Sequence, residues 1–421
     1  MLFYLSLSLF SLVLAGLFGL LIALTRTPVV SLLKSPELFY HFLVGHVTFS
    51  ITVWLMTFTL AFWHYRKDKM VTSAQPTTLL GMILLSISCL IPYGEPHLNN
   101  YIPVIGHPVF YLGLALFFFG FSIEVLQRLG SLRLILSPDT RHQLYALSIS
   151  TGLLTLVSFL PSFLVAHPEG GTRMYFERLF WIPGHLQQFM YTSVMLAVWH
   201  ELFRRASNRE VNSPLLGAVN PFLFLFPLSL FLGFFTDPIS QGFRLVVVLA
   251  FGVGMGVPVL LHTFFLLKDL RLGWNVATLS LLTSMSVYYA GEVIAYAGMQ
   301  SDLRIPAHYH GVVSGVTISF MGLTYYMLKE RYGSVFWERA ARLQPLVFGV
   351  GINLLVLGFY LAGRLGTPRK TYGFEYVQDL KVILALNIMG IGSLMAVLGG
   401  LLFLAYATPT LLKNYRHVKT F

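Results

Sequence analysis

Long apolar segments recur along the whole chain, and they constrain its fold more than any other feature. A membrane-spanning helix needs about 20 mostly apolar residues. Twelve segments approach or meet that length, at roughly 3–25, 39–63, 77–93, 106–128, 143–166, 181–203, 217–236, 243–267, 274–299, 307–328, 344–363 and 381–408. Only 11% of the 421 residues are charged, whereas a soluble domain carries about 25%. The sequence therefore predicts an all-α polytopic membrane protein, with one domain of twelve transmembrane helices over 1–421. It excludes a soluble enzyme, a nucleic-acid-binding protein and a disordered chain.

The basic residues predict how the helices are oriented. There are 28 Lys and Arg residues against 17 Asp and Glu. If the N-terminus is cytoplasmic, most of the basic residues fall in inner loops or in the C-terminal tail, and these include Arg66, Lys67, Lys69, Lys413, Arg416 and Lys419. Cytoplasmic loops are enriched in Lys and Arg. We therefore expect a multi-pass protein of the inner (plasma) membrane with both termini in the cytoplasm. The basic excess then needs no nucleic-acid partner.

Four histidines fall at a similar depth in this topology. His46, His185, His308 and His310 all lie in the outer half of the membrane. An ionisable side chain inside a membrane is costly and usually marks a functional site. The alternative is that each imidazole simply bonds a helix backbone or interfacial water. Convergence of four histidines at one depth favours a cofactor site, and a single cysteine, Cys89, rules out a thiolate metal cluster.

The pair His308 and His310 indicates which cofactor fits. Residues i and i+2 of a helix point to nearly opposite sides, so one helix can supply a ligand on each flank. A zinc site would need both histidines on one face, at i and i+4. Neutral imidazole is a common axial ligand of haem iron. The spacing therefore predicts two haems rather than one metal ion.

Haem propionates need cationic partners, and the segment GRLGTPRKTYGF supplies candidates. It places Arg369 and Lys370 in the outer loop after the eleventh segment. Arg suits bidentate recognition of carboxylates, and Lys adds a point charge. Such a basic dipeptide can also be a solvated loop face. Its position on the side of the histidines favours a propionate-binding role.

These motifs resemble subunit I of the haem–copper oxidase superfamily, in particular the B-type cytochrome c oxidases. FLVGHVTFSITVW is similar to the family's second helix, AHYHGVVSGVTISFMGLTYYML to its tenth, RLFWIPGHLQQF to its sixth and LAGRLGTPRKTYGF to its propionate-binding segment. The resemblance implies His46 and His310 as the ligands of a low-spin haem and His308 as the ligand of a high-spin haem. It also implies His185 as a copper ligand, with Arg369 and Lys370 on the propionates.

The chain departs from this family at the copper site. Where the family has two adjacent histidines in its seventh helix, this chain reads FLGFFTDP, with Phe234, Phe235 and Thr236. The tyrosine expected four residues after His185 is Phe189, with Tyr191 two residues beyond. Phenyl groups cannot bind copper, so we expect a degenerate site without copper. Tyr191 and His185 stay candidate catalytic residues.

Three other polar residues lie within the apolar segments or at their ends. Glu292 is an intramembrane carboxyl, and glutamates near a non-haem iron serve nitric oxide reductases of this superfamily, so Glu292 is a third candidate catalytic residue. His262 falls where some relatives carry a proton-channel lysine; it could relay protons or simply bond water at a helix end. Glu124 lies near a helix end and is expected to be interfacial.

Three functions therefore remain. The favoured prediction is a membrane haem protein that carries electrons through one low-spin and one high-spin haem in a respiratory complex. The alternatives are a working reductase of oxygen or nitric oxide with a modified metal site, and a non-catalytic structural or proton-conducting subunit. Among these functions, the sequence favours an oxidoreductase over a non-catalytic subunit. The expected partners are other respiratory-complex subunits, among them a subunit II-like or cytochrome c-type electron donor.

Overall fold

The computed structural model describes residues 1–421 apart from 29, 31, 33, 67–72, 374–378 and 419–421, and the side chains of 413–418 are also not described. The described part is helical almost throughout, with one antiparallel pair of three-residue strands. Of the basic residues used to predict the orientation, Lys67, Lys69 and Lys419 lie outside the described residues, as do the side chains of Lys413 and Arg416. The chain divides into two compact units.

The first unit comprises Met1–Tyr4 and Leu55–Leu270. Its helices are α3 (Trp54–Arg66), α4 (Ala74–Leu90), α5 (Pro108–Leu126), η2 (Leu129–Leu136), α6 (Thr140–Val165), α7 (Thr172–Ser207), α8 (Pro214–Val219), α9 (Phe222–Leu225), η3 (Phe226–Phe234), α10 (Gln241–Leu249), η4 (Ala250–Gly256) and α11 (Val257–Lys268). The strands β1 (Glu95–His97) and β2 (Val104–Gly106) pair before α5. The 36-residue helix α7 packs along α6 and carries His185 and Tyr191.

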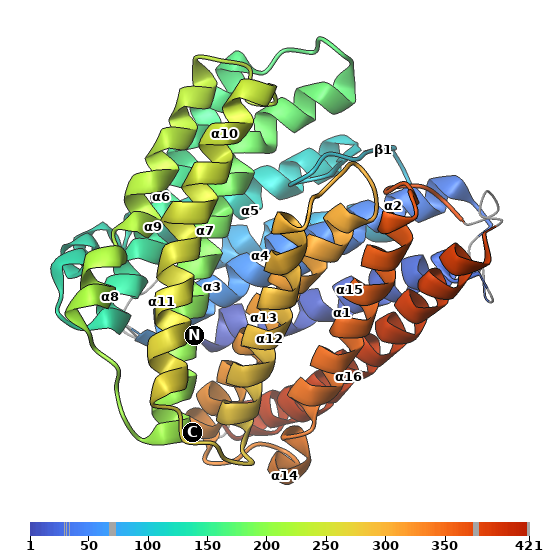
Figure 1. Ribbon diagram of the computed structural model, residues 1–421. Coiled ribbons are helices and arrows are strands. Elements are labelled where there is room, and N and C mark those ends of the chain that lie inside the picture. Colours follow the sequence, from blue (N-terminus) through green and yellow to red (C-terminus); the bar gives the residue numbers. More distant parts are fainter. Residues whose placement is uncertain (29, 31, 33, 67–72, 374–378, 419–421) are drawn as a thin grey trace. The chain divides into compact units, whose positions relative to one another are not determined.

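The second unit comprises Leu5–Trp54 and Arg271–Phe421. Its helices are α1 (Leu2–Arg26), α2 (Pro36–Val47), η1 (Thr48–Val53), α12 (Val276–Tyr296), α13 (Arg304–Tyr332), α14 (Glu338–Ala341), α15 (Gln344–Arg364) and α16 (Leu380–Val418). Within this unit α15 and α16 run side by side, as do α12 and α13 (Figure 1). The candidate haem ligands predicted from the sequence lie on α2 and α13.

Nine helical spans of the described residues are long and apolar enough to cross a membrane. They begin at Leu2, Pro36, Pro108, Thr140, Pro214, Gln241, Arg304, Glu338 and Leu380. The three other expected segments are also helical. α4 is apolar but has only 17 residues, and α7 and α12 carry more polar side chains. The prediction of an all-helical membrane protein is thus confirmed, while the total of twelve spans stays a prediction.

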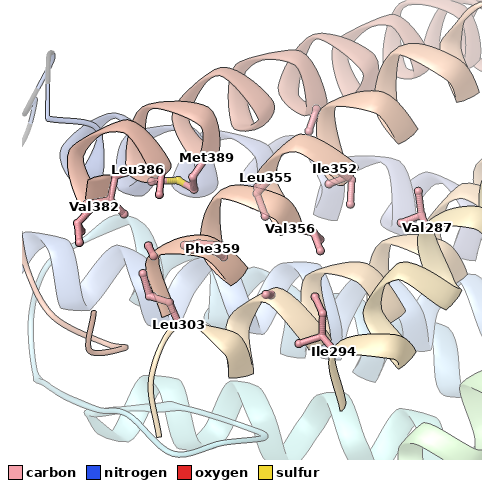
Figure 2. Packing of buried hydrophobic residues seen from close by; sticks show 14 of the residues in the cluster. Val287, Ile294, Leu303, Ile352, Leu355, Val356, Phe359, Val382, Leu386 and Met389 are labelled. Carbon is pink, nitrogen blue, oxygen red and sulfur yellow. The ribbon is translucent and has the colours of Figure 1, made fainter. Parts of the chain in front are cut away.

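The core of the second unit is made by α12, α13, α15 and α16. Figure 2 shows Leu355, Val356 and Phe359 of α15 packed between Leu386 and Met389 of α16 and the side chains of α12 and α13. Glycines let the α15 and α16 backbones approach. A Cβ atom on Gly351 would lie 2.4 Å from the amide nitrogen of Ala396. Small residues at such contacts are typical of helices that pack in membranes.

Local sequence signals fix the start of α2 and a distortion in its middle. The Ser35 side chain accepts a hydrogen bond from the amide of Leu38, and Pro36 occupies the first helical turn, where a missing N–H costs nothing. The helix continues from α2 through η1, a π-helical turn, into α3. π-helical turns occur frequently at functional sites. This one begins two residues after His46, so the wider turn lies directly beside the candidate ligand.

Candidate haem-binding site

His46 is oriented by helix α1. Its Nδ1 donates a hydrogen bond to the carbonyl oxygen of Ala15 at 2.9 Å. A Cβ atom on Gly19 would lie 2.9 Å from the His46 ring, so a larger residue would displace the imidazole. With the proton on Nδ1, a neutral imidazole has its lone pair on Nε2. Such a backbone bond on one ring nitrogen is the usual support of a histidine that binds metal through the other.

His310 on α13 is held in the same way. Its Nδ1 donates to the carbonyl oxygen of Pro306 at 2.7 Å. The rings of His46 and His310 have centroids 6.4 Å apart and planes inclined by only 14°. Two metal–imidazole bonds of about 2 Å each, together with the distance from each nitrogen to the centre of its ring, account for a separation of this size. The two residues therefore fit the axial ligands of one haem iron.

His308 lies on another flank of α13. Its Nδ1 donates to the carbonyl oxygen of Gly291 on α12 at 2.9 Å, which again leaves the lone pair on Nε2. The contact exists because α12 and α13 meet at glycines: a Cβ on Gly311 would lie 2.5 Å from the Cα atom of Gly291. His308 and His310 are thus fixed by different backbone carbonyls, as two ligands for two separate groups require.

Glu292 follows Gly291 on α12 and lies close to His308. The Glu292 carboxyl bonds the hydroxyl of Tyr288, one turn earlier on the same helix, and is within electrostatic range of His308. Tyr288 is 2% exposed. Glu292 itself is partly buried, so it is a half-buried, hydrogen-bonded carboxyl.

The loop after α15 carries Arg369 and Lys370, and two other residues anchor it. Arg26, at the end of α1, donates from Nη2 to the carbonyl oxygen of Pro368 and to the Thr371 hydroxyl, both at 3.4 Å. Asp302 pairs with Pro368 through a β-bridge. The loop is thereby tied to the start of α13, where His308 and His310 lie.

Arg26 is a residue that the sequence reasoning missed. It is 6% exposed, and its Nε is buried without a hydrogen-bond partner among the described residues. Both Arg26 and Arg369 are within electrostatic range of Tyr309, which stands between the two histidines of α13. A buried donor without a partner costs free energy, so an anionic group at this position would satisfy it. The sequence offers one sign of this role, which is that a basic residue ends an apolar helix.

Asp302 and Arg304 form the other anchor of this region. Arg304 donates from its guanidinium to both carboxylate oxygens of Asp302, with a shortest distance of 2.7 Å, and its backbone amide adds a fourth bond. Burial disfavours the charged carboxylate, but these bonds outweigh it and hold the pKa of Asp302 below its usual value. The pair stabilises the N-terminal turn of α13.

His185 lies in the first unit, on α7, and both of its ring nitrogens are occupied. Nδ1 donates to the carbonyl oxygen of Trp181 at 2.7 Å, so Nε2 accepts from the hydroxyl of Tyr101 at 2.9 Å. The Tyr101 ring packs directly over Gly184, where a Cβ would lie 2.4 Å from Cγ of the ring. Phe251 of η4 contacts both His185 and Phe189.

The loop that carries Tyr101 is fixed by polar contacts. The Asn99 side chain accepts from the amides of Tyr101 and Ile102, and Asn100 bonds the Glu177 carboxylate of α7. Tyr101 was not predicted as a site residue. No spacing rule connects a loop tyrosine with a histidine 84 residues later in the chain.

The other candidates of the first unit are separate from this contact. Tyr191 is 4% exposed, and its hydroxyl has no hydrogen-bond partner within the described part of the chain. Phe235 is 86% exposed. Across the described residues, no group of three His, Cys, Asp or Glu side chains is arranged to hold a metal ion.

The first unit also contains two buried networks of hydrogen-bonded polar side chains. Glu124, expected at the interface, is instead fully buried and bonds Tyr4, His64 and Arg128. Elsewhere the Nε2 of His200 lies 2.7 Å from Nδ1 of His262. Neither network could be predicted from the sequence, because its members come from different helices.

The fold is that of a helical membrane protein, and the rings of His46 and His310 lie side by side in its second unit. The family of cytochrome c and quinol oxidase polypeptide I matches residues 1–402. The chain therefore belongs to that family, which is subunit I of the haem–copper oxidase superfamily.

Individual relatives agree with this assignment. The chain is 32% identical to an uncharacterized protein of Aquifex aeolicus, over 77% of this chain and 83% of the relative. It is 26% identical to an uncharacterized protein of Rickettsia prowazekii, over 97% and 95%. It is also 22% identical to cytochrome c oxidase subunit 1 of Bacillus subtilis, over 59% of this chain but only 40% of that protein.

Proposed function

We propose that this protein carries electrons through a low-spin and a high-spin haem within a respiratory complex, and that it lacks the copper centre of its family. The observation that carries the proposal is the pair His46 and His310, whose nearly parallel rings lie 6.4 Å apart with both Nδ1 atoms bonded to backbone carbonyls. A bound haem would supply reversible one-electron chemistry at its iron. The protein orients the two imidazoles before the haem binds.

His308 is proposed as the axial ligand of the second haem. Its bond to Gly291 fixes the ring and leaves Nε2 as the ligating atom. Arg26, Arg369 and Lys370 are proposed to hold propionates. Arg26 supports this assignment because its buried Nε needs an acceptor.

The residues around His185 do not fit copper. The Nε2 lone pair that a metal would need already accepts the Tyr101 hydroxyl. The neighbouring side chains Phe189 and Phe251 are apolar. A copper ion needs several nitrogen or sulfur donors to compete with water, and one imidazole engaged in another bond does not meet that requirement.

The remaining predictions complete the proposal. All of 1–421 would form one domain of twelve spans in the plasma membrane, with both termini cytoplasmic. A subunit II-like or cytochrome c-type partner would deliver the electrons. Reduction of oxygen or nitric oxide at a modified site involving His185, Tyr191 and Glu292 stays the alternative.

A second candidate function, proton movement, is favoured by one buried chain of hydrogen bonds. The carbonyl of Ile135 accepts from Gln143, Gln143 accepts from Asn220, and Asn220 accepts from Nε2 of His262. A neutral His262 with its proton on Nε2 must accept at Nδ1, so His200 donates from its Nε2. The amides thereby fix both tautomers and leave the lone pair on Nδ1 of His200.

This chain of bonds gives a test of the proton-movement candidate. His200→Phe should abolish proton uptake on reduction of the protein in vesicles, measured with a pH dye, while the haem spectrum stays intact. Gln143→Leu should reduce that uptake less, because the two imidazoles remain. Undiminished uptake in His200→Phe would exclude the relay.

The haem proposal is tested by spectroscopy of single variants. His46→Ala and His310→Ala should each remove the sharp low-spin band of the reduced protein and leave a haem that binds carbon monoxide. His308→Ala should remove the response to carbon monoxide instead. His41→Ala on the same helix is the matched control and should keep both signals. Retention of the low-spin band in both His46→Ala and His310→Ala would refute the ligand assignment.

A further inference from the structure

A pocket in the second unit lies at the end of α13 opposite to the histidines. Its volume is about 670 Å³, and it is lined by the segment before α12, the last turns of α13 and the segment around α14. The walls include Trp274, Tyr326, Lys329, Trp337, Arg339 and Arg342. None of these residues has a part in the proposed electron transfer.

The position of the pocket coincides with the ends of two membrane spans. One apolar span ends at Tyr332, and the next begins at Glu338. Trp274 and Trp337 are 59% and 67% exposed. Tryptophan is enriched where the hydrocarbon meets the headgroups, so these two exposed indoles mark that boundary. The predicted orientation puts it in the cytoplasmic leaflet.

The charges on the pocket wall are mainly positive. The one acidic wall residue, Glu338, pairs with Lys329 at 2.5 Å. Arg342 donates from Nε to the carbonyl of Arg339 and from Nη1 to the carbonyl of Trp274, both at 3.1 Å. Neutral carbonyls position this guanidinium without neutralising it.

Arg339 adds a second uncompensated cation. Its side chain makes no ion pair or hydrogen bond with the described residues. α12 also begins here, at Val276, and the N-terminus of a 21-residue helix favours negative charge. A ligand for this pocket must therefore carry an anionic group that accepts hydrogen bonds.

The size and the apolar wall narrow the class of ligand. A phosphate ion alone would leave most of 670 Å³ unfilled. Val276, Val335 and Ala341 provide apolar surface beside the cations. Basic pockets between transmembrane helices on the cytoplasmic side are suited to anionic lipid headgroups. We propose that this pocket binds an anionic phospholipid of the cytoplasmic leaflet through Arg339 and Arg342.

Native mass spectrometry of the full purified chain tests the proposal. The protein in detergent is titrated with phosphatidylglycerol or with phosphatidylcholine of the same acyl chains, and bound lipid is counted. Each basic residue near an anionic surface contributes about a factor of five to binding. Arg339→Gln/Arg342→Gln should therefore bind phosphatidylglycerol about 25-fold more weakly. The matched control Arg133→Gln/Arg209→Gln replaces two exposed arginines of the first unit and should leave binding unchanged.

The outcomes separate a lipid from other sources of the same chemistry. Preference for phosphatidylglycerol that survives excess inorganic phosphate and is lost only in the pocket variant supports the proposal. Equal binding of the two lipids, or equal loss in the control variant, overturns it. Complete displacement of the lipid by inorganic phosphate would assign the pocket to the free ion and also overturn it. The assignment to the cytoplasmic leaflet rests on the proposed orientation, but lipid counting depends on neither haem nor orientation, so its failure is distinguishable from failure of the proposed electron transfer.

Discussion

In each of the four candidate histidines, a hydrogen bond from Nδ1 to one backbone carbonyl fixes the tautomer of the imidazole. Ala15, Trp181, Gly291 and Pro306 each accept the Nδ1 proton of one imidazole. Backbone bonding was the alternative to metal binding in the sequence argument, but the two are compatible. A bond at Nδ1 leaves the lone pair on Nε2, the atom that is free to bind a metal. Only at His185 does another group, the Tyr101 hydroxyl, occupy that nitrogen.

The basic residues near Tyr309 should tune a haem potential. A positive charge close to the propionates favours the reduced iron, which is one charge less positive. We therefore expect Arg26→Gln and Arg369→Gln each to shift a haem midpoint potential downward in a spectroelectrochemical titration. Arg133→Gln, exposed in the first unit, is the control and should have no effect. If both variants keep full haem content and unchanged midpoint potentials, these residues have only a structural role.

Asp302 gives a prediction for pH. Its pKa is lower in the folded protein than in the unfolded chain, where it is about 3.9. The stabilisation is therefore fully present well above pH 4 and is lost as the pH falls through the lower folded value. Asp302→Asn should lower the melting temperature at pH 7, and the difference from the unmodified protein should shrink at about pH 3 to 4. A difference that does not change with pH would contradict this account.

Helices α12 and α13 pack against each other at glycines. This contact determines where His308 lies. Gly291 contributes its carbonyl to the His308 bond and its Cα to the contact with Gly311. The sequence motif AHYHGVVSG predicted a helix with two opposed histidines, and α13 has that form. It could not predict the partner helix, because the same motif would fit any neighbour with a small residue at the contact.

Enlarging Gly311 tests this helix contact. Gly311→Ala places a methyl group against the α12 backbone and should cost about 1–3 kcal/mol of stability. It should also weaken the carbon monoxide response, because the helices must separate at the His308 bond. Gly16→Ala on α1 is the control, since a Cβ there has nothing within 4 Å. An equal melting temperature for the two variants would show that the close contact is unimportant.

Across the whole molecule, the sequence predicts apolar helices better than the contacts between them. Leu2–Arg26 and Leu380–Leu412 are recognisable from hydropathy alone. α7 is less apolar because it carries His185, Glu201 and four arginines, yet it is one of the longest helices. The candidates His46, His308 and His310 could be proposed from the sequence because each helix carries its own motif. Tyr101, Arg26 and Glu124 could not, because their roles depend on loops and helices distant in sequence.

The central claim is that one chain binds two haems and no copper. The most direct test measures haem by its pyridine derivative, and iron and copper by elemental analysis, against protein concentration in one purified sample. The account predicts two haem irons per chain and copper far below one per chain. A single haem, or stoichiometric copper in the same preparation, would contradict it.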